Sequence, residues 1–111
     1  MKVIESIIYK DNYNSLTIND KEIIYNDISM KINEEMYLNY LKDLFLIIND
    51  WNNEYINLSI IDGGSWNLVI KFVDNSERKY VGRSDRPNNF EEFENLNFSL
   101  IKEVQNGYIE Y

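Results

Sequence analysis

Apolar residues in this chain follow two spacings that alternate along the sequence. In several short stretches every second residue is apolar, most clearly from Trp66 to Phe72, and this is the spacing of a β-strand with one buried face. Two longer stretches, at about 34–50 and 90–104, repeat instead every three or four residues. That second spacing is typical of amphipathic helices. The chain is therefore predicted to place its elements in the order βββα-βββα.

The connections between the predicted strands are short, which favours antiparallel pairing. One long strand is predicted from Glu22 to Ile32, with Ile24, Ile28, Met30 and Ile32 on its buried face. A hairpin is predicted between the alternating residues 56–60 and the strand 66–72, joined by a turn at 62–65. We expect an α+β fold in which a mostly antiparallel sheet of five to six strands carries two helices on one face.

Local signals at the helix ends support this reading. Asn33 precedes two glutamates, as an N-cap does, and Asn89 has Glu92 three positions later, as in a capping box. Gly107 is placed to stop the second helix. Residues 108–111 are predicted to form a short edge strand or a frayed tail. Gly82, within a strand pattern, predicts a bulge or the close approach of a bulky group such as an aromatic ring.

Length and composition limit the classes of function. The 111 residues fit a single domain spanning 1–111, and 44% of them are hydrophobic, which is enough to form a core. The chain has no cysteine and no histidine. Disulfides, thiolate nucleophiles, imidazole acid-base catalysis and nearly all zinc sites are thereby excluded. We expect no cofactor.

The charge balance points away from nucleic acid and membranes. Nineteen acidic residues against eleven basic ones give a net charge of −8, which repels phosphate groups and anionic lipids. Between Lys71 and Arg86 basic residues outnumber acidic ones by two, a balance that suits the solvent face of a sheet. Glu5 and Ser6 interrupt the first apolar stretch, and Leu44 to Ile48 is too short to span a bilayer. A cytoplasmic location is expected.

One enzymatic pattern is present. Asp62, followed after a hairpin by Glu77 and Lys79, resembles the Asp…Glu-x-Lys core of magnesium-dependent nucleases. In that chemistry two carboxylates hold the metal and the lysine orients the attacking water. Asp62 and Glu77 also stand beside predicted turns, where acidic residues are common for structural reasons.

A wider resemblance covers under a third of the chain, from Asp62 to Phe93. The pattern Gly63-x-x-Trp66, then Gly82, then Pro87-x-Asn-Phe-x-Glu-Phe93, resembles one that recurs in small uncharacterised bacterial α+β domains. The resemblance implies that the tryptophan strand packs against the helix that opens at Asn89-Phe90. In size and charge the chain is also similar to immunity proteins and to phage-encoded inhibitors such as anti-CRISPR proteins.

These observations favour a non-enzymatic acidic protein that neutralises a basic protein partner, either a toxin or an effector that handles nucleic acid. Direct binding of nucleic acid or membrane is not expected. The alternatives are the metal-dependent nuclease and a structural domain, for instance a homodimer. The residues predicted to contact the partner are mostly acidic: Glu34, Glu35, Tyr37, Asp85, Glu91, Glu92 and Glu94.

Overall fold

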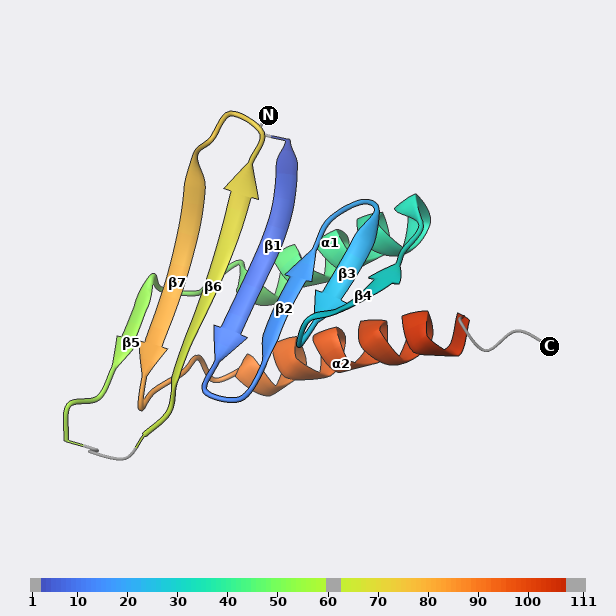
Figure 1. Cartoon of the computed structure of the whole chain (residues 1–111). Helices are drawn as coiled ribbons and strands as arrows, with labels where there is room; N and C mark the ends of the chain where they lie inside the picture. The colour runs from blue at the N-terminus through green and yellow to red at the C-terminus, as the bar shows by residue number, and fades with distance from the viewer. Residues whose placement is uncertain (1–2, 60–62, 108–111) are drawn as a thin grey trace.

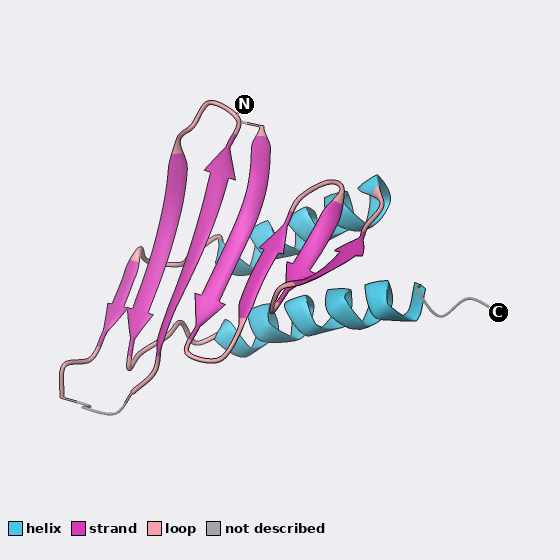
Figure 2. Ribbon diagram, viewed as in Figure 1, coloured by secondary structure: helices cyan, strands magenta, loops and turns pink. Residues whose placement is uncertain are grey.

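The computed structural model describes residues 3–59 and 63–107. Within these residues seven strands form one sheet, and two helices lie together on one side of it (Figures 1 and 2). The elements are β1 (Ile4–Asp11), β2 (Ser15–Ile18), β3 (Glu22–Tyr25), β4 (Ile28–Lys31), α1 (Glu34–Ile48), β5 (Glu54–Ile56), β6 (Ser65–Phe72), β7 (Glu77–Arg83) and α2 (Phe90–Gly107). The α+β class and the placement of both helices on one face are confirmed.

The strands lie in the order β4-β3-β2-β1-β6-β7-β5. Five neighbouring pairs are antiparallel, and β5 pairs with β7 in parallel. The sheet is therefore mixed and has seven strands, rather than the five to six that were predicted. The two differences from the predicted topology fall at opposite edges of the sheet.

At one edge, the predicted strand from Glu22 to Ile32 is wrong, because it is two strands. Asn26 and Asp27 adopt positive φ angles of 48° and 71° and form a tight turn between β3 and β4. This turn reverses the chain and changes which residues face the core. Ile23 is fully buried, whereas Ile28 is 63% exposed. The prediction that Ile24 and Ile28 face the core is therefore wrong, while Met30 and Ile32 are buried as predicted.

At the other edge, the predicted hairpin between residues 56–60 and β6 is wrong. The strand β5 is only three residues long and pairs with β7, Tyr55 lying opposite Gly82. Its neighbour Leu58 is 82% exposed and contributes no strand. Residues 60–62 and 108–111, including Asp62 and the predicted C-terminal edge strand or tail, lie outside the described residues.

The core lies between the sheet and the helices. The predicted stripe of α1 is buried at Tyr37, Tyr40, Leu44 and Ile48. The stripe of α2 is buried at Phe90, Phe93, Leu100, Ile101 and Val104, with Leu96 partly buried. These side chains cover the inward residues of the central strands, among them Ile7, Leu68 and Ile70, which are at most 1% exposed. Neither described helix is long and apolar enough to cross a membrane.

The two predicted helix caps have different outcomes. Asn33 caps α1 as predicted, because its side-chain oxygen accepts the Met36 backbone N–H at 2.8 Å. The prediction for Asn89 is wrong. Its side-chain oxygen accepts the indole N–H of Trp51 at 2.7 Å, and its amide donates to the Ile47 carbonyl at 2.8 Å. Asn89 therefore ties the start of α2 to the end of α1. The described part of α2 reaches Gly107, and the predicted stop after it lies at the limit of the described residues.

Candidate binding surface

The solvent side of the two helices is strongly acidic. We call the exposed sides of α1 and α2 the helix layer. Seven carboxylates lie on it, against two lysines, Lys42 and Lys102. Among the described residues, six of the seven have no ion-pair partner, and Glu94 pairs with Arg86. The seven are Glu34, Glu35, Asp43, Glu91, Glu92, Glu94 and Glu103.

The helices run antiparallel, so the predicted acidic contacts divide into two groups (Figure 1). Glu34 and Glu35 lie in the first turn of α1, and Glu91 and Glu92 lie in the first turn of α2. Fifteen residues of helix correspond to about 22 Å. The structure therefore places the two groups at opposite ends of the helix layer, where one partner surface of ordinary size can still reach both.

Tyr37 was predicted as a contact, and the structure places it in the core. Its side chain is 5% exposed, and its hydroxyl has no hydrogen-bond partner among the described atoms. Burial, reinforced by the charge of Asp20, raises the pKa of the Tyr37 hydroxyl. The Tyr37 side chain is therefore part of the core beneath the helix layer.

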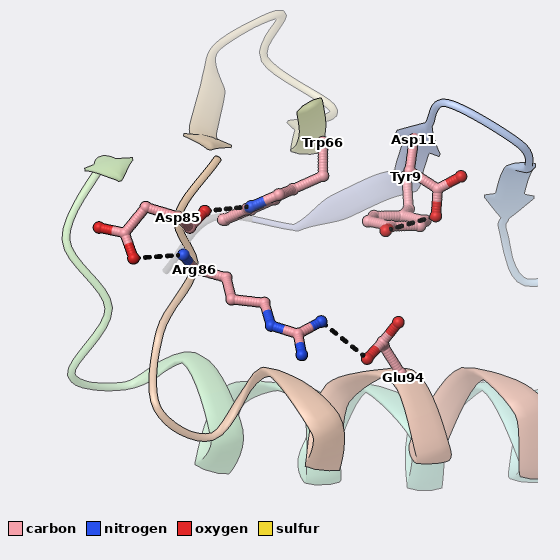
Figure 3. A network of polar contacts seen from close by, with 6 residues as sticks. All are labelled: Tyr9, Asp11, Trp66, Asp85, Arg86 and Glu94. Carbon is pink, nitrogen blue, oxygen red and sulfur yellow. Dashed lines mark hydrogen bonds and ion pairs between the residues drawn. The ribbon is translucent and has the colours of Figure 1, made fainter. Parts of the chain in front are cut away.

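A second candidate site lies at the end of the sheet where α2 begins. A hollow of about 510 Å³ opens there, and we call it the cup. Its walls are the aromatic rings of Tyr9, Trp66 and Phe90, and polar side chains surround them: Asp11, Asp85, Arg86 and Glu94. Figure 3 shows their polar contacts: one lies within the end of β1, and the others link the start of β6, the loop before α2 and α2 itself.

On the β1 side, Asp11 is held by several donors. One of its carboxylate oxygens accepts the Tyr9 hydroxyl at 2.8 Å, and the other accepts the backbone N–H groups of Tyr13 and Asn14. Burial is the largest cause of a raised pKa at the Tyr9 hydroxyl, and the charges of Asp11 and Glu94 raise it further. Arg86 acts in the opposite direction and lowers this pKa.

On the opposite side, the loop before α2 is fixed by Trp66. The indole N–H of Trp66 donates to the Asp85 carbonyl at 2.9 Å, and the Asp85 carboxylate accepts the backbone N–H of Arg86 at 2.8 Å. The indole lies directly over Gly82, where any Cβ would collide with it. The predicted approach of an aromatic ring to Gly82 is confirmed.

Arg86 and Glu94 meet across the cup. Their closest nitrogen and oxygen atoms are 3.6 Å apart, and both side chains are about half exposed. The Arg86 guanidinium also lies 5.5 Å from the centre of the Phe90 ring. Of the predicted contact residues, Asp85 and Glu94 line the cup.

Sequence reasoning missed Tyr9, Asp11 and Trp66 as members of one site. Asp11 and Trp66 are 55 positions apart and become neighbours because β1 and β6 pair in that register. The one usable signal was Gly82, which predicted the ring but not what surrounds it.

The described residues of the predicted nuclease core lie away from the helix layer and from the cup. Glu77 and Lys79 lie on the sheet face opposite the helices, where their side chains form an exposed ion pair at 3.4 Å. Asp62 is outside the described residues, so its position relative to them is not described. In residues 3–59 and 63–107 no three acidic side chains converge as metal ligands do.

Fold and surface together define an α+β domain with an acidic helix layer and an aromatic cup beside it. Comparisons with protein family models, with curated proteins and with solved structures found no match for this chain.

Proposed function

We propose that this chain is a non-enzymatic binding protein that neutralises a basic protein partner, in the manner of an immunity protein or a phage-encoded inhibitor such as an anti-CRISPR protein. The partner is a toxin or an effector that handles nucleic acid, and it binds on the helix layer. The absence of histidine and cysteine from the sequence supports a role in binding rather than catalysis.

The observation that carries this proposal is the uneven distribution of charge. Seven of the nineteen acidic residues lie on the helix layer, where only two lysines oppose them. The opposite face of the sheet carries the basic side chains of Lys10, Lys79 and Arg83 beside acidic ones such as Glu77, which pairs with Lys79. A protein with this polarity presents its helices first to a basic partner, because the field orients the encounter.

Carboxylates of the helix layer are also free to pair with basic side chains of a partner. Glu35 and Asp43 on α1 and Glu103 on α2 line a groove of about 370 Å³ between the helices. All three are exposed and have no ion-pair partner in the part of the chain that the structure describes. A lysine or arginine of a partner can therefore pair with them without first breaking an internal salt bridge.

The test compares two variants of equal net charge. One replaces Glu35, Glu91 and Glu92 with glutamine, and the control replaces Glu5, Glu54 and Glu77 with glutamine on other parts of the surface. Proteins retained by the immobilised chain from a bacterial extract are identified, and the affinity of each purified one is measured. We expect a basic partner whose affinity falls about tenfold with the first variant, since each lost contact costs a fraction of a kcal/mol.

The control variant is expected to change the affinity less than about twofold. An equal loss in both variants would contradict a site on the helix layer, because net charge alone would then explain the binding. A partner that is neutral or acidic would contradict the proposal as a whole.

A further inference from the structure

The cup combines two kinds of group that recognise organic cations. Aromatic faces attract cations through their ring quadrupole, and carboxylates attract them by charge and hydrogen bonding. The rings of Trp66 and Phe90 are 4.8 Å apart between centres and form one continuous apolar wall. Two carboxylates, from Asp11 and Glu94, lie beside that wall against the single guanidinium of Arg86, whereas the Asp85 carboxylate points away from it (Figure 3). The net charge of the lining therefore favours a further cation.

The groups of the cup are held in place before any ligand arrives. Asp11 accepts three hydrogen bonds, and the loop at Asp85 is fixed by the Trp66 indole. The Phe90 ring is 3% exposed and packed in the core. A site of this kind binds without a large ordering cost, because its side chains do not have to be immobilised on binding.

Arg86 already occupies part of this environment. Its guanidinium lies over the Phe90 ring and beside Glu94, which shows that the cup accommodates that group. The ion pair is long, at 3.6 Å, and its side chains are 60% and 46% exposed. Exposed pairs with such geometry contribute little free energy. An external cation can therefore displace Arg86 from Glu94 at small cost.

We propose that the cup receives an arginine side chain of the partner, which takes the place of Arg86 beside Glu94 and stacks on the aromatic wall. This inference rests on the proposed function, since a basic partner supplies the side chain. Arginine fits better than lysine because its planar guanidinium can stack on a ring and pair with a carboxylate through two N–H groups.

The experiment uses a small probe, N-acetyl-arginine methylamide, and follows the nitrogen-15 NMR spectrum of the chain. We expect saturable shifts of the Trp66 indole N–H and of the Asp85 and Arg86 backbone amides. The neutral isostere N-acetyl-citrulline methylamide is expected to cause no such shifts, because it lacks the charge. The backbone amide of Ile23, in β3 and outside the cup lining, serves as an internal control.

Two variants and a matched control make the result specific. Glu94→Gln is expected to weaken binding of the probe about fivefold, and Arg86→Ala to strengthen it about threefold because a competing cation is removed. Glu54→Gln, in β5 and outside both the cup and the helix layer, is expected to leave binding unchanged. The absence of shifts at Trp66, equal shifts with the citrulline probe, or equal losses in Glu94→Gln and Glu54→Gln would overturn the inference.

Failure of this inference and failure of the proposed function give different results. If a basic partner binds the helix layer but the arginine probe leaves Trp66 unaffected, the cup inference alone is wrong. If the probe saturates the cup while every retained partner is neutral or acidic, the proposed function is wrong and the cup remains a site for guanidinium groups.

Discussion

The two faces of the sheet are built from the same strands, but one is packed under the helices and the other is open to solvent. On β6, Trp66, Leu68 and Ile70 point under the helices and are at most 6% exposed, whereas the residues between them, such as Val69, remain partly accessible. The covered face leaves so little room that Gly82 is needed beneath an indole ring. The open face is not covered by any described element (Figure 2). The covered face therefore determines the fold, and the exposed surfaces are available for function.

The largest effect on stability is expected from a substitution that adds atoms to the covered face. Gly82→Val would drive a side chain into the Trp66 indole and separate β7 from the helices. We expect it to lower the free energy of unfolding by about 3 kcal/mol, as overpacked cores do. Urea denaturation followed by tryptophan fluorescence measures this change.

The matched control for this substitution is Gly107→Ala at the end of α2. A Cβ at Gly107 meets nothing within 4 Å. Alanine there is expected to stabilise the protein by up to about 0.5 kcal/mol, since it forms helix better than glycine. Equal stabilities of Gly82→Val and the unmodified chain would show that the covered face is not closely packed around Trp66.

Two tyrosines on the covered side of α1 are expected to differ in how much their hydroxyl groups stabilise the protein. The Tyr40 hydroxyl donates to the side-chain oxygen of the buried Asn97 at 2.6 Å, whereas the Tyr37 hydroxyl has no partner among the described atoms. Tyr40→Phe leaves Asn97 unsatisfied, and we expect a loss of about 1–2 kcal/mol. Tyr37→Phe removes an unpaired polar atom.

The expected change in stability for Tyr37→Phe is therefore zero to slightly positive. Thermal and urea unfolding of the two variants under identical conditions measure the difference. Equal destabilisation by both substitutions would mean that ring packing, rather than the bond to Asn97, explains the loss at Tyr40.

The smallest effect is expected on the open face. Lys79→Ala removes an ion pair with Glu77 in which the lysine side chain is 63% exposed. Such pairs contribute little, so we expect a change of less than about 0.5 kcal/mol in the free energy of unfolding. A loss above about 1 kcal/mol would show that the open face contributes to the fold as the covered face does. The same urea titration measures it.

Local signals in the sequence predicted the covered face well. The two helical stripes, the Asn33 cap and the ring over Gly82 depend on residues close in sequence or on one glycine. The turn at Asn26-Asp27 was missed because the apolar residues on both sides continue the alternation of a single strand. Asn89 was misread because its partner, Trp51, is 38 positions away.

The candidate site was predicted only in part for the same reason. The acidic first turns of both helices are visible in the sequence, but their separation follows from the antiparallel arrangement of α1 and α2. The cup depends on the register of β1 against β6, which apolar spacing does not specify. Asp85 and Glu94 were selected for their charge, and the aromatic wall between them was not expected.

The most direct test of the account is the salt dependence of association with a purified basic partner. Association rates are measured over increasing salt concentration for the unmodified chain, for the variant with glutamine at 35, 91 and 92, and for the variant with glutamine at 5, 54 and 77. The account predicts a steep fall of the rate with salt for the unmodified chain and the second variant, and a shallow fall for the first. The same slope for all three proteins would contradict binding through the helix layer.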